Sequence, residues 1–206
     1  MTPPGLTVLI LAAGFSSRLG RAKALARVRS VSLMRRTVAL AARLEPAKIL
    51  VVLPPRATRY RLEARGFEVV FIANPRRAEG LSSSVRIGVE RARYSSALLL
   101  LPVDLAVLQS RDLKRLIARW RATRRRVIAR RIVAGDKAPH GGVPLILPNW
   151  LYARALDVSG DIGLRDLVAR LALEQRVLVN LPSAARDVDT WDELRAVRQR
   201  PAELIP

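Results

Sequence analysis

Short apolar runs along the chain alternate with longer segments whose apolar residues recur every three or four positions. The short runs indicate buried strands, and the periodic segments indicate amphipathic helices. We predict strands at residues 7–11, 49–53, 68–72, 97–101 and 127–129, a late strand at 143–147 and an edge strand at 176–179. We predict helices at residues 32–44, 59–65, 83–92, 111–122, 164–173 and 191–198.

This alternation of strands and helices predicts an α/β fold, because the helices that connect parallel strands cover both faces of the sheet. We expect a Rossmann-like three-layer α/β/α arrangement with a mostly parallel sheet. The 206 residues suit one domain with a full core. We place this domain at residues 1–200 and a C-terminal tail at residues 201–206.

Composition narrows the class of protein further. Half of the residues are hydrophobic, but no apolar run approaches the length that spans a bilayer, and the N-terminus lacks the charged start of a signal peptide. The sequence has no Cys, which excludes disulfides, thiolate metal sites and Cys nucleophiles. We expect a cytoplasmic enzyme with no membrane partner.

The formal net charge of +20 is compatible with nucleic-acid binding. Only four of the 37 basic residues are Lys, however, and the Arg residues are spread through the predicted helices. Aromatic residues make up 4% of the chain and do not alternate with the basic ones, so no base-stacking surface is predicted. We therefore expect no specific nucleic-acid partner, and a positive field that favours an anionic substrate.

The polar loop after the first predicted strand carries the strongest chemical signal. Residues 11–23 read LAAGFSSRLGRAK. Glycine lets the backbone approach an anion closely, and successive N–H groups can form an anion-binding nest. Arg18 can form a bidentate fork on phosphate oxygens, and Lys23 can add a point charge. The spacing matches neither a Walker A motif nor the Rossmann glycine motif. The alternative is a basic surface loop.

This loop resembles the signature loop of the MobA-like nucleotidyltransferases, and its Ala-Ala-Gly resembles the molybdenum cofactor cytidylyltransferase branch. The resemblance implies a nucleotide-diphospho-sugar transferase-like fold, an NTP substrate (CTP favoured), a phosphorylated acceptor such as molybdopterin cofactor, release of pyrophosphate and Mg²⁺ as cofactor. It also implies a molybdoenzyme or chaperone as partner. It assigns catalysis to Arg18 and Lys23, and nucleotide binding to Leu11, Ala12, Ala13, Gly14, Ser16, Ser17 and Gly20.

Asp104 follows the predicted strand at 97–101. Ligands of open α/β sheets sit at the carboxyl ends of strands, where a carboxylate can hold Mg²⁺ beside a triphosphate. A helix N-cap or a loop aspartate is the alternative for this residue taken alone. The resemblance makes Asp104 catalytic and a metal ligand, although the family's frequent D-x-P has Ala106 in place of Pro.

A second block, at residues 74–88, resembles the family's N-P-x-x-x-x-G-x-S-x-S block, which lies beside the base and ribose. Taken alone, Ser82 or Ser83 would be an N-cap of the following helix. The resemblance assigns nucleotide binding to Asn74, Gly80, Ser82, Ser83 and Ser84.

Two later blocks concern the acceptor. Gly142 and Pro144 flank the position where related cytidylyltransferases have the His of Gly-His-Pro, and the one His of the chain, His140, receives no catalytic role. Asp161 lies in a block that resembles L-x-G-D-x-G-A-R, and it either caps a helix or contacts the acceptor. The resemblance assigns acceptor binding to Gly142, Pro144 and Asp161.

The last block, at residues 187–194, resembles the family's D-x-D-T-x-x-D-L end, in which an Asp reaches the metal. It implies Asp189 as the second Mg²⁺ ligand with Asp104, and Asp187 as the substitute. Two other classes of function stay open. One is a guanylyltransferase or a sugar- or polyol-phosphate cytidylyltransferase on the same fold. The other is a non-catalytic nucleotide- or RNA-binding protein, against which the two aspartates argue.

Overall fold

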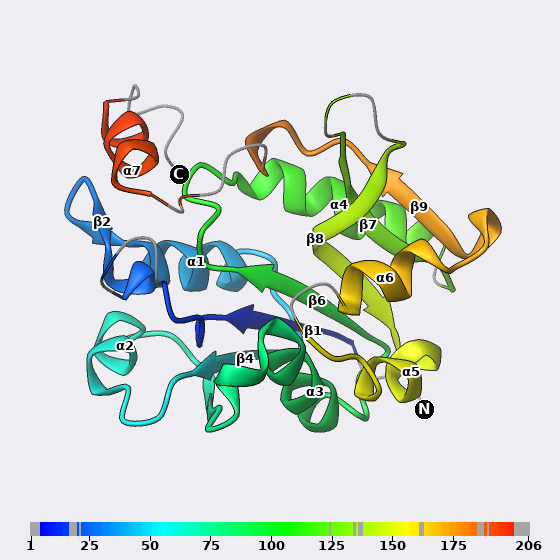
Figure 1. Cartoon of the computed structure of the whole chain (residues 1–206), viewed down its shortest axis with the longest axis horizontal. Coiled ribbons are helices and arrows are strands. Elements are labelled where there is room, and N and C mark those ends of the chain that lie inside the picture. Colours follow the sequence, from blue (N-terminus) through cyan, green and yellow to red (C-terminus); the bar gives the residue numbers. More distant parts are fainter. Residues whose placement is uncertain are drawn as a thin grey trace.

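A seven-stranded sheet forms the middle layer of the computed structural model (Figure 1). The structure describes residues 5–16, 20, 22–123, 125–133, 135, 138–160, 163–184, 188 and 190–199. The strands of this sheet are β1 (Leu6–Leu11), β4 (Lys48–Leu53), β5 (Val70–Ala73), β6 (Ala97–Pro102), β7 (Val127–Ile132), β8 (His140–Pro148) and β9 (Arg176–Val179). A separate hairpin consists of β2 (Arg27–Val28) and β3 (Val31–Ser32).

The strand order is β5-β4-β1-β6-β8-β7-β9. Strand β8 is antiparallel to both of its neighbours, and the other neighbouring pairs are parallel. The expected mostly parallel sheet is therefore confirmed. Leu9 of β1 pairs with Leu50 of β4 and with Leu100 of β6, so these three strands end together at one edge of the sheet.

Helices cover both faces of this sheet (Figure 1). They are α1 (Leu33–Ala42), α2 (Thr58–Glu63), α3 (Leu81–Arg91), α4 (Ser110–Thr123), α5 (Tyr152–Leu156), α6 (Gly163–Ala169) and α7 (Trp191–Arg198). One buried cluster joins α1 and α4 to one face of the sheet, and a second joins α3, α5 and α6 to the other. Helix α7 packs in a third cluster, with β2 and residues 106–107.

Each strand contributes side chains to both buried clusters, because successive side chains of a strand point to opposite faces of the sheet. In β1, Val8 and Ile10 belong to the cluster beneath α1, whereas Leu9 and Leu11 belong to the cluster beneath α3. Helix α3 lies close to β1 at Gly88, where an added Cβ would stand 2.1 Å from a methyl carbon of Leu9. This contact brings the start of α3 close to the carboxyl edge of the sheet.

The predicted helices and strands are all present, most of them with shifted ends, whereas β9 and α7 have the predicted bounds. The helix expected from residue 32 begins one residue later because Ser32 is its N-cap, whose Oγ accepts a hydrogen bond from Arg35 N at 3.1 Å. The late strand begins at His140, and it is longer than expected. The β2–β3 hairpin and α5 were not predicted. Residues 200–206 lie outside the described part of the chain, so the domain boundary and the tail stay predictions.

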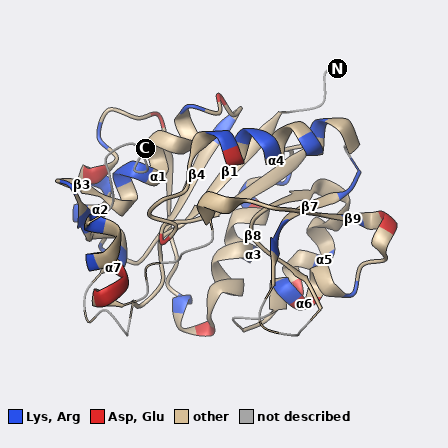
Figure 2. Ribbon diagram, turned by 90° about the horizontal axis from the view of Figure 1, so that it is seen from above, with Lys and Arg blue, Asp and Glu red and all other residues tan. Residues whose placement is uncertain are grey.

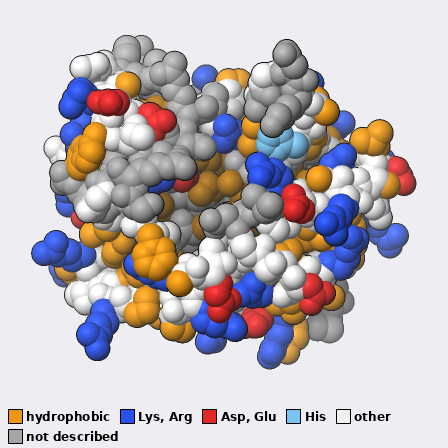
Figure 3. All heavy atoms as spheres, viewed as in Figure 1, with side chains coloured by type: hydrophobic (Ala, Val, Ile, Leu, Met, Phe, Trp, Pro, Cys, Tyr) orange, Lys and Arg blue, Asp and Glu red, His pale blue; other side chains and the backbone are white. Residues whose placement is uncertain are grey.

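Basic side chains are dispersed over the fold. Figure 2 shows Lys and Arg along α4 and also on α6 and α7. Figure 3 shows blue side chains scattered around one face rather than gathered in one patch. Within the described ranges, no helix has the length and apolar character needed to cross a membrane.

Candidate active site

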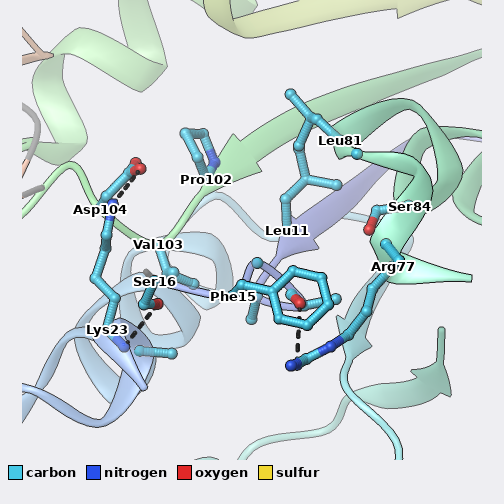
Figure 4. Close-up of a pocket in the computed structure, with 16 residues that line it drawn as sticks. Leu11, Phe15, Ser16, Lys23, Arg77, Leu81, Ser84, Pro102, Val103 and Asp104 are labelled. Carbon is cyan, nitrogen blue, oxygen red and sulfur yellow. Dashed lines mark hydrogen bonds and ion pairs between the residues drawn. The ribbon is translucent and has the colours of Figure 1, made fainter. Parts of the chain in front are cut away.

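A pocket of about 360 Å³ lies at the carboxyl edge of the sheet, where β1 and β6 end (Figure 4). Three parts of the chain contribute lining residues: residues 11–16 and 23–24 at and after the end of β1, residues 77–78, 80–81 and 84 around the start of α3, and residues 102–104 at the end of β6. Nine of the predicted site residues belong to its lining, namely Leu11, Ala12, Ala13, Gly14, Ser16, Lys23, Gly80, Ser84 and Asp104.

Lys23 and Asp104 meet at one end of this pocket. Lys23 Nζ donates to Asp104 Oδ2 at 3.3 Å, and both side chains are mostly buried, with 13% and 27% of their surface exposed. Lys23 begins a short 3₁₀ turn, and its backbone N–H donates to Ser16 Oγ at 3.0 Å. Ser16 has a φ of 55°, in the left-handed region. The loop after β1 therefore folds back to bring a cation beside the carboxylate that follows β6.

Asp104 lies in the turn after β6, and α4 begins only at Ser110. Asp104 is therefore not a helix N-cap, and its place in a loop agrees with the other alternative for this residue. The carbonyl oxygen of Asp104 accepts hydrogen bonds from the backbone N–H groups of Ala106 and Val188, both at 2.9 Å. Val188 is fully buried. The C-terminal segment is thus attached directly to the backbone of Asp104.

The same segment is held a few residues earlier. The carboxylate of Asp112, which is buried at the start of α4, accepts from the backbone N–H and the hydroxyl of Ser183 at 2.9 and 2.6 Å. Ser183 is therefore anchored to the start of α4, and Val188 to the turn after β6. The two aspartates that flank Val188 in the sequence, Asp187 and Asp189, lie outside the described residues.

The donor set at this end of the pocket fits Mg²⁺ bound together with a nucleotide. Mg²⁺ is usually held by one or two carboxylates, with substrate phosphates and waters completing its shell. Asp104 supplies one such carboxylate at the pocket. Among the residues that the structure describes, no three His, Cys, Asp or Glu side chains gather into a metal site of their own. The described residues thus suit a metal shared with a substrate.

Asn74 supports the end of the pocket that lies away from Lys23 and Asp104. Its side chain is fully buried, and its Nδ2 donates to Ser83 Oγ at 2.8 Å and to Ser84 Oγ at 3.0 Å. Its Oδ1 accepts from the backbone N–H of Arg76 at 2.9 Å. Asn74 therefore joins the turn after β5 to the first turn of α3, and holds Ser84 at the pocket wall.

The serines after Gly80 do not cap α3, so that expectation is wrong. Gly80 itself is the N-cap residue, with a φ of 87° that favours glycine. Ser83 Oγ donates to the Gly80 carbonyl at 2.8 Å, and Ser82 Oγ accepts from Arg86 at 3.4 Å. Ser82, Ser83 and Asn74 are buried and are not lining residues of the pocket.

Asn74→Ala is expected to lower the free energy of unfolding by about 2–3 kcal/mol, because it leaves buried donors and acceptors without partners. The melting temperature should fall by roughly 4–12 °C for a chain of this size. Thermal unfolding followed by circular dichroism measures this change. The matched control is Asn149→Ala at an exposed position, which should change stability by no more than about 0.5 kcal/mol. Equal melting temperatures for the two variants would contradict a supporting role for Asn74.

Arg77 and Phe15 are among the residues at this end of the pocket that were not predicted. Arg77 places its Cζ 3.9 Å from the centre of the Phe15 ring, and its Nη1 donates to the Ala13 carbonyl at 3.3 Å. Figure 4 shows both residues at the side of the pocket away from Lys23 and Asp104. The sequence does place a pair of arginines, Arg76 and Arg77, inside the N-P-x-x-x-x-G block. Because arginines are spread over the whole sequence, this pair did not stand out as a binding feature.

The remaining predicted residues lie elsewhere or outside the described part. Gly142 and Pro144 are in β8, and the pairing of Leu100 with Leu145 places them toward the same edge of the sheet as Asp104. Neither lines the pocket. Gly20 is described, with a φ of 67°, and also does not line it. Ser17, Arg18 and Asp161 lie outside the described residues.

Several solved structures share this fold. Rv0371c from Mycobacterium tuberculosis H37Rv matches with a TM-score of 0.78 and 24% identity, over 97% of this chain and 100% of that chain. A nucleotidyl transferase from Methanothermobacter thermautotrophicus, Mth528, has a TM-score of 0.77 and 20% identity, over 94% and 96% of the chains. A 2-C-methyl-D-erythritol 4-phosphate cytidylyltransferase from Thermus thermophilus has a TM-score of 0.66 and 19% identity, over 93% and 96%. No curated protein that we compared matches the chain.

The sequence itself also matches a family. The MobA-like NTP transferase domain matches residues 8–177, a span that runs from β1 into β9. It includes the loop after β1, the start of α3 and the turn that carries Asp104, which are the segments that form the pocket. The chain therefore belongs to the MobA-like NTP transferases, a family of nucleotidyltransferases.

Proposed function

We propose that the enzyme transfers a nucleoside monophosphate from CTP to a phosphorylated acceptor such as molybdopterin cofactor, with release of pyrophosphate. The observation that carries this proposal is the Lys23–Asp104 pair at the pocket, which places a cation for phosphate beside a carboxylate for a metal. Ala12-Ala13-Gly14, which resembles the cytidylyltransferase branch, supports CTP as the nucleotide.

The reaction needs no covalent intermediate with the protein. An oxygen of the acceptor phosphate attacks the α-phosphorus of CTP, the bond from that phosphorus to the bridging oxygen of the β-phosphate breaks, and pyrophosphate leaves with the bonding electrons. Lys23 and Arg18 would hold the triphosphate. The backbone of Gly14 and its neighbours would approach the phosphates, since glycine has no side chain in the way. Positioning and charge neutralisation supply most of the acceleration in reactions of this type.

Asp104 would hold Mg²⁺ together with Asp189, or with Asp187 as the substitute. The hydrogen bond from Val188 to the Asp104 carbonyl supports this pairing, because Val188 stands between those two aspartates in the sequence. When bound, Mg²⁺ neutralises charge on the phosphate oxygens. A manganese complex of the similarly folded Rv0371c (TM-score 0.71, 22% identity, over 97% of this chain and 100% of that chain) supports a divalent metal.

The other assigned residues complete the proposed site. Ser84 and Gly80 would contact the nucleotide directly, and the buried Asn74, Ser82 and Ser83 would hold the wall that these two form. For the acceptor we propose Gly142 and Pro144 at the same edge of the sheet, and Asp161. We also propose that the enzyme works in the cytoplasm, where NTPs are supplied. Its product would pass to a molybdoenzyme or a chaperone.

A polyol-phosphate cytidylyltransferase is the second candidate. The fold similarity to the Thermus thermophilus enzyme supports it. Val143 stands where related cytidylyltransferases have the His of Gly-His-Pro, and this departure concerns the acceptor.

A thermal-shift screen of CTP, GTP, ATP and UTP, each with and without Mg²⁺, tests the proposal. A ligand at about 100 times its dissociation constant stabilises the folded state by about 2.7 kcal/mol, which corresponds to a rise in melting temperature of roughly 5–10 °C. We expect CTP with Mg²⁺ to give the largest rise. If none of the four nucleotides raises the melting temperature, the protein does not bind an NTP and the proposal fails.

A further inference from the structure

The end of the pocket away from Lys23 and Asp104 has a built arrangement of its own. The Arg77 guanidinium lies 3.9 Å from the centre of the Phe15 ring, well within the range of a cation–π contact. Its Nη1 donates to the Ala13 carbonyl at 3.3 Å. The ring and the carbonyl therefore hold the guanidinium from two directions, although Phe15 itself is 57% exposed.

This guanidinium carries its charge into the pocket without an ion-pair partner among the described residues. Arg77 lines the pocket and is half-buried, and in the pocket wall it contacts the ring and the carbonyl. It also interacts electrostatically with Tyr60, which is not a lining residue. A guanidinium has five N–H donors, and one of them is used by Ala13. Several donors at this end of the pocket are therefore available to a ligand.

The two ends of the pocket offer different chemistry. Lys23 and Asp104 suit phosphate and metal, whereas Phe15, Leu81 and Ser84 at the other end form an apolar and aromatic wall with one hydroxyl. Figure 4 shows Arg77 on this second side, beside Phe15 and Ser84. If the triphosphate lies beside Lys23 and the metal beside Asp104, as the proposed function requires, the base of the same nucleotide reaches toward Arg77.

We propose that Arg77 is the specificity-determining residue for the base, and that it selects a nucleobase with two adjacent hydrogen-bond acceptors. The inference rests on the proposed function, which places an NTP in this pocket. The planar fork of a guanidinium pairs best with two neighbouring acceptors, as it does with O6 and N7 of guanine. Cytosine offers such a pair in N3 and O2. Adenine and uracil offer none, because their acceptors alternate with donors. The site therefore accepts CTP or GTP and rejects ATP and UTP.

Calorimetric titration of the whole protein with each of the four NTPs and Mg²⁺ tests this inference. Arg77→Gln removes the charge and the fork, and Arg77→Lys keeps the charge but loses the fork. Arg76→Gln is the matched control, because Arg76 is an adjacent, exposed arginine whose backbone N–H, not its side chain, contacts Asn74. In the unmodified protein, CTP or GTP should bind at least about tenfold more tightly than ATP and UTP, and the comparison of CTP with GTP identifies which base is taken.

Arg77→Gln and Arg77→Lys should both weaken the preferred nucleotide by about tenfold to a hundredfold, while ATP and UTP change little and Arg76→Gln has no effect. An equal loss for all four nucleotides in Arg77→Gln, with affinity retained in Arg77→Lys, would make Arg77 a phosphate contact and overturn the inference. A preference for ATP or UTP in the unmodified protein would also overturn it, and would leave the proposed transferase function intact. Absence of binding by every NTP would instead overturn the proposed function itself.

Discussion

Asp104→Asn is expected to reduce the rate of pyrophosphate release from CTP, at saturating acceptor and Mg²⁺, by at least about a hundredfold, the scale seen when one preorganised electrostatic contact is lost. A neutral amide is a poor ligand for Mg²⁺ beside a triphosphate. The change keeps the size of the side chain and leaves the backbone carbonyl free to accept from Ala106 and Val188. The fold should therefore be retained, and a titration of rate against Mg²⁺ concentration measures the effect.

Asp192→Asn is the matched control. This aspartate is 88% exposed on α7, and it pairs with Arg195 at 3.2 Å, away from the pocket. It should leave the rate unchanged. Normal turnover by Asp104→Asn at ordinary Mg²⁺ concentrations would mean that the metal is held elsewhere and that the assignment of Asp104 is wrong. A parallel measurement on Asp189→Asn tests the second proposed ligand, for which we expect a defect of the same kind.

Lys23→Gln is expected to weaken the binding of CTP with Mg²⁺ by about tenfold to a hundredfold, because a charge-assisted hydrogen bond to phosphate contributes about 1.5–3 kcal/mol. Calorimetric titration gives the dissociation constant directly. The effect should extend equally to all four NTPs, since the phosphates are common to them. This uniform loss differs from the base-dependent loss expected for the Arg77 variants.

Lys48→Gln provides the control for a lost lysine charge. Lys48 is exposed at the first residue of β4, whereas the pocket lies at the opposite, carboxyl edge of the sheet. The affinity of the Lys48→Gln variant for CTP should match that of the unmodified protein. An unchanged dissociation constant in Lys23→Gln would remove Lys23 from the phosphate-binding role.

The fold was predictable from the sequence because its central strands are fully buried. Strand β6 is apolar from residue 97 to residue 101, and a buried strand is recognised from such a run without long-range information. The β2–β3 hairpin was not predictable in the same way. Its strands are two residues long, which is too short for any period to be read, and its turn uses Arg29 and Ser30 with positive φ rather than glycine.

The sequence predicted which segments form the pocket, but it predicted fewer of the contacts between their side chains. The loop after β1 and the block before α3 were both identified, and the expectation that Ser82 or Ser83 caps α3 failed because Gly80 occupies the N-cap position. A residue pattern alone does not tell whether a serine faces solvent or a buried amide such as Asn74. The Arg77–Phe15 contact joins residues that are 62 positions apart, so it depends on how the sheet brings two loops together.

The hydrogen bond between Val188 and Asp104 has a consequence for synthesis of the enzyme. Chains emerge from the ribosome from the N-terminus, and contacts between distant residues cannot form until the later partner has been made. A nascent chain that ends before residue 188 already contains every described residue that lines the pocket, yet it lacks the amide that holds the Asp104 carbonyl. The hydrogen bond that holds the Asp104 carbonyl can therefore form only late in synthesis, once residue 188 has been made.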